Sequence, residues 1–154
     1  MSQEKDVLEQ LELSSEEIQE LRRRLNSSVA SFAAYATSLL QGRDSATTTA
    51  QQLRGLIAEV IAPEGAWKQR DLARVGEIAS SYRHHPEKLA ITCPDPDTRL
   101  WLARALQVAL DVDRHPHHGV YAVRANPTLS EAGEIIVVAP EDPQVKGYPR
   151  VLVF

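Results

Sequence analysis

The sequence of 154 residues contains few of the residue types that build several common kinds of site. Its single cysteine, Cys93, excludes an intrachain disulfide and a cysteine-rich zinc knuckle. Seven glycines leave little from which to form a phosphate-binding loop, and the sequence has no P-loop, no Gly-x-Gly-x-x-Gly and no Gly-x-Ser-x-Gly. Aromatic residues are only 5 % of the chain and do not alternate with basic residues, so a base-stacking surface is not indicated.

Long apolar runs and an excess of positive charge are also missing. The longest apolar stretch, around 135–140, falls far short of the roughly 18 residues that a membrane span needs. The first ten residues are polar and have no apolar core of a signal peptide. The formal net charge of −4 disfavours nonspecific binding to nucleic acids. We therefore expect a soluble, cytoplasmic protein with no membrane partner, and a nucleic-acid partner is disfavoured.

The composition is otherwise that of a globular protein, with 43 % hydrophobic and 25 % charged residues. The N-terminal part reads as helical over 13–41, starting at a capping box formed by Ser14 and Glu17. A heptad-like apolar stripe follows, with an irregular step at Ser28 and Val29. We predict that this stripe is an association surface, and its residues are Ile18, Leu21, Leu25, Phe32, Tyr35 and Leu39.

A second helix is expected over 46–62, where apolar residues fall on one face and Pro63 ends the pattern. With the first helix it predicts an antiparallel helical hairpin. We place a boundary here, with a helical association region over 1–62 and a small α+β domain over 63–154. Two helices alone cannot bury both stripes. We therefore favour self-association as a two-fold dimer, and the alternative is an intrachain seam.

The region 63–154 predicts helices over 67–83 and 96–110 and four short strands. The order strand, helix, strand implies one parallel pair with a right-handed crossover, and we expect the later strands to be joined as hairpins. The predicted class is therefore α+β, with a coiled-coil-like helical hairpin and a small mixed sheet that carries two further helices. The strands are expected at 89–93, 120–125, 134–139 and 150–154.

All five histidines lie in two short runs, each placed where a helix gives way to a strand. Imidazoles beside carboxylates can bind metal ions or transfer protons near neutral pH. Histidines at a helix C-terminus also stabilise the helix dipole, which is the competing structural interpretation. If the two strands are parallel, both runs reach one edge of the sheet. The candidate ligand-binding residues are His84, His85, His115, His117, His118, Asp111 and Asp113.

The run Arg83-His84-His85-Pro86-Glu87 resembles locally the pterin carbinolamine dehydratases, in which a helix ends in His-His-Pro. The resemblance covers residues 84–87 and the passage from helix to strand. It implies that His84 and His85 flank a pterin and assist the loss of water. The aromatic residue that the family has about six positions after the proline is missing from 89–92, and a proline turn and a helix follow where the family has a further histidine on the next strand.

The remaining polar groups favour structural roles. Asp95 and Asp97 stand at the start of a predicted helix, where acidic residues cap the free N–H groups. Cys93 at the end of an apolar strand is typical of a small buried residue, although a helix N-terminus can activate a thiol. The basic residues of 67–83 predict a solvated helix face, with an acidic or nucleic-acid partner as the alternative.

These observations favour a non-enzymatic adaptor, assembly or regulatory protein that acts through protein–protein contacts and self-association. No cofactor or metal is indicated, and no complete catalytic set of residues can be assembled from the sequence. The alternative is a small enzyme, or a ligand- or metal-binding domain, that uses the two histidine runs.

Overall fold

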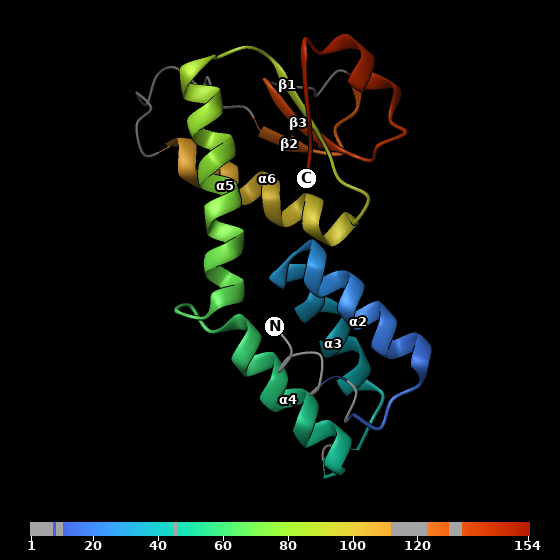
Figure 1. Ribbon diagram of the computed structural model, residues 1–154. Helices are drawn as coiled ribbons and strands as arrows, with labels where there is room; N and C mark the ends of the chain where they lie inside the picture. Colours follow the sequence, from blue (N-terminus) through green and yellow to red (C-terminus); the bar gives the residue numbers. More distant parts are fainter. Residues whose placement is uncertain (1–7, 9–10, 45, 112–122, 130–133) are drawn as a thin grey trace. The chain divides into compact units, whose positions relative to one another are not determined.

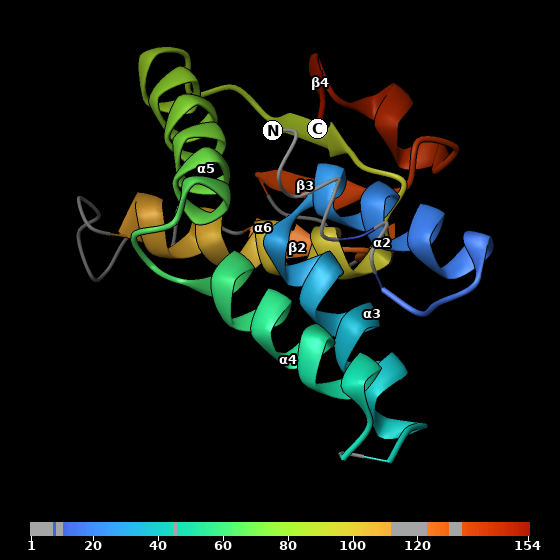
Figure 2. The ribbon, with the colours of Figure 1, turned by 60° about the horizontal axis from the view of Figure 1, so that its bottom comes forward.

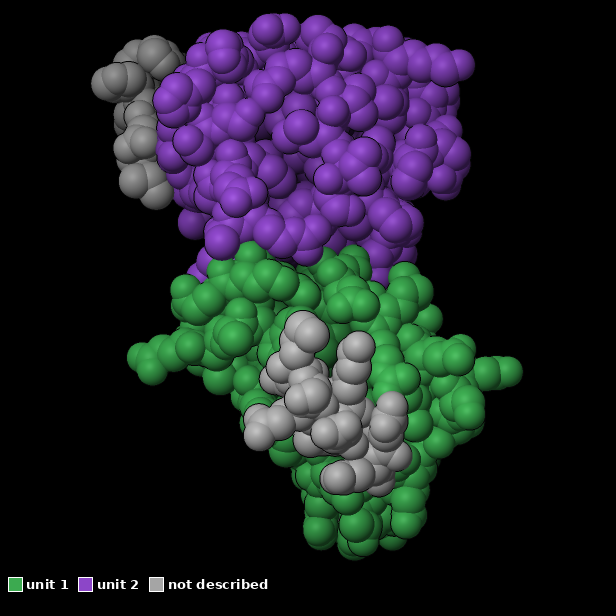
Figure 3. Space-filling model, viewed as in Figure 1, with its two compact units in different colours: residues 1–71 green, residues 72–154 purple. Residues whose placement is uncertain are grey.

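The computed structural model describes residue 8 and residues 11–44, 46–111, 123–129 and 134–154. It contains helices and a four-stranded sheet, so the predicted α+β class is confirmed (Figure 1). The chain forms two compact units, Met1–Asp71 and Leu72–Phe154, which Figure 3 distinguishes by colour. The first unit is helical, and the second contains the whole described sheet.

The first unit begins where the sequence predicts. Helix α2 (Ser15–Ser27) starts at a complete capping box. The Ser14 Oγ accepts a hydrogen bond from the Glu17 N–H at 3.1 Å, and Glu17 Oε1 accepts one from the Ser14 N–H at 3.0 Å. Two N–H groups that the helix itself cannot bond are therefore satisfied by local residues.

The helix does not continue to residue 41, so the expectation of one helix over 13–41 is wrong. Ser28 is extended (φ −169°, ψ 159°), which ends α2 and starts a new helix, α3 (Val29–Gln41). The Ser28 side chain caps α3 by accepting a hydrogen bond from the Ser31 N–H at 3.0 Å. The extended residue turns the chain at this step, which is why the coiled-coil description does not apply to two short helices.

Helix α4 (Thr48–Ile61) is capped by Thr47, whose side chain accepts a hydrogen bond from the Ala50 N–H at 3.1 Å. Figures 1 and 2 both show α3 and α4 side by side and joined by a short connection, as expected for a helical hairpin. The apolar faces of α2, α3 and α4 meet in one core cluster. Its buried side chains from these helices are Leu21, Leu25, Val29, Phe32, Ala36, Leu53, Leu56 and Val60.

Helix α5 (Ala66–His84) belongs to both units, because the division falls between Asp71 and Leu72. The sequence placed a boundary earlier, at Pro63, where the helical pattern is interrupted. The start of α5 instead belongs to the first unit, in which Trp67 packs against the helical core.

The second unit is built on a sheet of strand order β2-β3-β1-β4. Every strand pairing described is parallel. The predicted mixed, hairpin-connected sheet is therefore wrong in strand direction. Successive strands of the chain do not simply neighbour each other, because β3 lies between β1 and β2, and β1 lies between β3 and β4. The elements that follow α5 are β1 (Leu89–Thr92), α6 (Pro96–Asp111), β2 (Val123–Ala125), β3 (Ile135–Val138), the 3₁₀ helix η2 (Pro143–Gly147) and β4 (Arg150–Val153).

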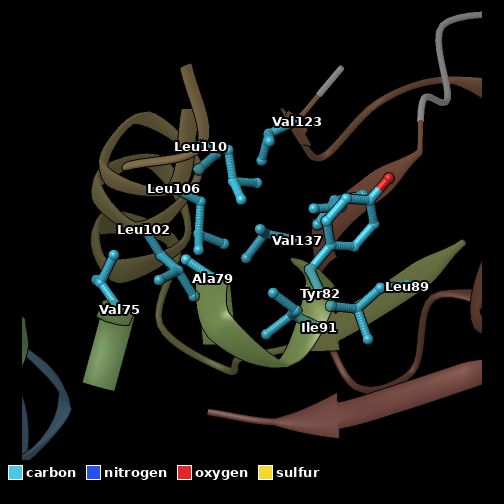
Figure 4. Packing of buried hydrophobic residues seen from close by; sticks show 12 residues of the cluster. Val75, Ala79, Tyr82, Leu89, Ile91, Leu102, Leu106, Leu110, Val123 and Val137 are labelled. Atoms are coloured by element: carbon cyan, nitrogen blue, oxygen red, sulfur yellow. The ribbon is translucent and has the colours of Figure 1, made fainter. Parts of the chain in front are cut away.

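Strands β1 and β3 are buried on both faces, as their near-continuous apolar sequences predict. On one face, α5 and α6 cover the main core of the unit (Figure 4). On the other face, Val145 and Tyr148 pack over a smaller cluster formed by Ala90, Ile136 and Val138. The two inner strands thus hold the unit together, while β2 and β4 form the edges of the described sheet.

Candidate functional site

The two histidine runs precede strands that begin at the same end of the sheet. Leu89, the first residue of β1, and Val123, the first residue of β2, both lie in register with Ile135 of β3. Since all three strands are parallel, the first residues of β1 and β2 lie at the same end of the sheet. The strand directions that the ligand-binding hypothesis requires are therefore present.

Most residues of the second run cannot be placed beside the first. His115, His117, His118 and Asp113 lie outside the described residues, as does the side chain of Asp111 at the end of α6. Convergence of the two runs therefore stays a prediction.

The first histidine run lies on the surface. His84 ends α5, and its Nδ1 lies 2.8 Å from the Ser80 carbonyl oxygen one turn earlier. Since a carbonyl only accepts, this nitrogen donates. The His85 ring is exposed, and its backbone carbonyl accepts a hydrogen bond from Arg150 Nη1 at 3.1 Å. The His84 contact is the helix-terminal role that the structural interpretation predicts.

A contact that the sequence did not suggest lies near the end of the sheet where β1, β2 and β3 begin. The Tyr82 ring is buried in the core, and Figure 4 shows its hydroxyl pointing out of the apolar cluster. That hydroxyl lies 3.5 Å from Glu134 Oε2, just before β3. Burial raises the pKa of Tyr148, and the negative charge of Glu134 raises it further. Glu134 thus interacts with the phenols of Tyr82 and Tyr148, which are distant from it in sequence, so no local sequence pattern predicts these contacts.

At the end of the sheet where β1 finishes, the acidic turn after β1 caps the helix that follows. Asp95 is 1 % exposed, and its Oδ1 accepts hydrogen bonds from the N–H groups of Asp97 (3.0 Å) and Thr98 (3.4 Å). Arg99 Nη1 donates to the Cys93 carbonyl at 2.7 Å, and Cys93 itself is buried. The predicted capping role of Asp95 is confirmed, and these contacts describe a helix start rather than a reaction centre.

A buried carboxylate in the first unit was also missed by the sequence analysis. Asp71 is fully buried and accepts a hydrogen bond from the Val29 N–H at 2.7 Å. Arg70 donates to its other oxygen through Nε (3.0 Å) and Nη2 (2.7 Å) and also donates to the Leu25 carbonyl at 2.8 Å. Asp71 therefore connects the start of α5 to the start of α3, where the helix dipole favours a negative charge. Sequence spacing could not reveal it, because 42 residues separate Asp71 from Val29.

The predicted association stripe is mostly internal to the first unit. Leu21, Leu25 and Phe32 are between 0 % and 4 % exposed. Ile18, Tyr35 and Leu39 are partly buried and pack against the same cluster. The intrachain seam is therefore the state that the structure shows for this stripe, and the three buried side chains offer no surface to a partner.

Most of the exposed large apolar side chains described lie in the second unit. Val153 and Val151, on β4, are 85 % and 45 % exposed. Leu100 and Val108 are exposed on α6. Exposed valines along an edge strand matter more than isolated surface residues, because they border unpaired backbone groups.

Among the described residues, no group of three or more His, Cys, Asp or Glu side chains could hold a metal ion. No helix in that part of the chain is long and apolar enough to cross a membrane. Comparisons with known protein families, with curated proteins and with solved structures find no match to this chain.

Proposed function

We propose that this protein is a non-enzymatic, cytoplasmic adaptor, assembly or regulatory factor that acts through protein–protein contacts, including self-association. The observation that carries the proposal is the exposed apolar edge strand β4, with Val153 85 % exposed. Natural proteins usually protect such edges with charge, proline or covering segments. A partner that pairs with this edge would satisfy its backbone groups and bury its valines.

The buried carboxylates support the same proposal. Asp71 and Asp95 are the buried acidic side chains of the described residues, and both bond to N–H groups at helix starts. A catalytic carboxylate needs access to a substrate, whereas these two are used in building the fold.

Self-association is tested by the molecular mass of the purified, tag-free chain across a dilution series. Native mass spectrometry and light scattering should give a dimer whose population rises with concentration. A chain that stays monomeric throughout would contradict the self-association part of the proposal. A denatured control identifies any covalent species.

A second candidate is a small enzyme, or a ligand- or metal-binding domain, that uses the histidine runs. It is favoured by one specific observation, the common starting edge of β1 and β2. Native mass spectrometry also tests it, because a bound metal or small molecule adds mass that denaturation removes. The adduct should diminish in a His84→Ala/His85→Ala variant and persist in a His84→Ala control if His85 carries the contact. A mass without adduct in zinc-containing buffer would contradict a zinc site.

A further inference from the structure

The free edge of β4 can be assigned residue by residue. The Phe154 N–H donates to the Thr92 carbonyl of β1 at 2.9 Å. Successive residues of a strand direct their N–H and C=O groups to opposite sides, so Leu152 also faces β1. Val151 and Val153 therefore direct their backbone groups away from β1. Since β4 is the last strand in the described sheet order, these groups lie along its open edge.

The side chains of this edge are uncharged and exposed. Val151 and Val153 lie on one face of the strand, and Leu152 packs on the other face against the core. The opposite edge differs, because β2 is one residue shorter than β4 and carries the exposed Arg124 at its centre. Charged residues on edge strands oppose pairing with another chain. Of the two described edges, β4 is the one whose central residues carry no such protection.

We infer that β4 pairs antiparallel with β4 of a second copy of this chain, about a two-fold axis at Leu152. The inference rests on the proposed self-association and names its surface. In this register Val151 of each copy lies opposite Val153 of the other, and each such pair exchanges two backbone hydrogen bonds. The exposed side chains of Val151 and Val153 then form cross-strand apolar pairs, which removes part of their surface from water.

The charges favour this occupant and this direction. Arg150 directs its guanidinium back into its own unit, where Nη2 donates to Ser81 Oγ at 2.6 Å. Antiparallel pairing places Arg150 opposite Phe154 of the second copy and separates the two Arg150 residues by about 13 Å along the strands. Parallel pairing would set the two arginines side by side and would not close as a two-fold dimer. The antiparallel register brings no like charges together.

The pairing is small, so the dimer should be weak. Four residues from each copy bury far less area than the roughly 1,600 Å² of a standard stable interface. We therefore expect a concentration-dependent equilibrium rather than a permanent dimer.

Disulfide trapping tests the register. In a Cys93→Ala background, Val151→Cys protein labelled with ¹⁵N is mixed with unlabelled Val153→Cys protein and oxidised. Residues that exchange backbone hydrogen bonds have Cα atoms about 5.5 Å apart, within the usual disulfide range. Two copies of Val151→Cys, or two copies of Val153→Cys, instead lie diagonally across the strands, with Cα atoms too far apart for an unstrained disulfide. Mass spectrometry should show the mixed disulfide forming about ten times faster than either disulfide between identical variants. This ratio corresponds to a difference of about 1.4 kcal/mol in activation free energy.

Substitution at the edge tests the surface without a cross-link. Val153→Lys should raise the dissociation constant of the dimer at least about tenfold, because it places charge in the pair, whereas Val153→Thr should change it little. Trp101 fluorescence during unfolding confirms that both variants fold. If Val153→Lys leaves the dimer intact and the mixed disulfide is not preferred, the chain associates through another surface: this inference fails and the proposed function stands. A wild-type chain that is monomeric up to about 500 µM overturns this inference and the self-association part of the proposed function.

Discussion

The two units deal with their apolar residues in different ways. In the first unit the stripe predicted as an association surface closes on itself, and Phe32 and Leu21 are fully buried. In the second unit the inner strands are fully buried, but β4 leaves Val153 85 % exposed. The difference follows from the elements themselves. A helix forms its backbone hydrogen bonds internally, so it needs only to bury its apolar face. An open sheet instead ends in two edge strands, and each has one side of its backbone unpaired within the sheet.

The largest expected effect tests whether the helical stripe is core or interface. Phe32→Ala should lower the free energy of unfolding of the first unit by about 3–5 kcal/mol, because it leaves a cavity around a fully buried ring. The chain has two tryptophans, with Trp67 in the first unit and Trp101 in the second. Chemical denaturation of Trp101→Phe protein, followed by Trp67 fluorescence, isolates the affected unit.

The matched control for this experiment is Leu106→Ala, read through Trp101 in a Trp67→Phe background. It should cost the second unit about 2–5 kcal/mol, because Leu106 is equally buried there. A Phe32→Ala chain that keeps its stability at low concentration but loses a dimer would show that the stripe is an interface after all.

A smaller effect is expected at the buried carboxylate of the first unit. Asp71→Asn should destabilise that unit by about 2 kcal/mol, because the Val29 N–H and Arg70 lose a charged hydrogen-bond acceptor. Denaturation read through Trp67 measures this change. Glu59→Gln, at an exposed position of α4 in the same unit, is the control and should change stability by less than about 0.5 kcal/mol. Equal effects for the two variants would contradict the role assigned to Asp71.

The smallest effect is a pH dependence confined to the first unit. Hydrogen bonds from Arg23 and Arg24 lower the pKa of Glu20 to about 2. A carboxyl whose folded pKa lies below its unfolded value of 4.5 adds stability above pH 4.5, and this contribution is lost as the pH falls toward 2. Because the Glu20 side chain is 30 % exposed, the contribution should stay below about 1 kcal/mol.

The measurement compares wild-type and Glu20→Gln proteins between pH 5 and pH 2 by Trp67-detected unfolding. The variant should lose less stability over this range than the wild type, while Trp101 reports the same curve for both. A variant that parallels the wild type at every pH would exclude Glu20 as a source of the acid sensitivity.

Local signals in the sequence predicted much of the secondary structure. The capping box at Ser14 and the Asp95 cap were both read from short patterns, because each depends on residues a few positions apart. The contact of His84 with the Ser80 carbonyl oxygen at the end of α5 agrees with the predicted helix-terminal role of the first histidine run, because it too joins residues a few positions apart. Residues that act through distant partners, such as Asp71 and the Tyr82–Glu134 pair, left no such signal.

The sequence by itself determined the α+β class, the approximate positions of most elements and the caps that start two of the helices. Only the tertiary structure decided where the first helix breaks, which strands are neighbours, that all their described pairings are parallel, and which apolar residues are buried. The physical reason is range. Capping and amphipathic periodicity operate within one or two helical turns, whereas strand order, strand direction and the Asp71 contact at the Ser28 break join segments that only the folded chain brings together.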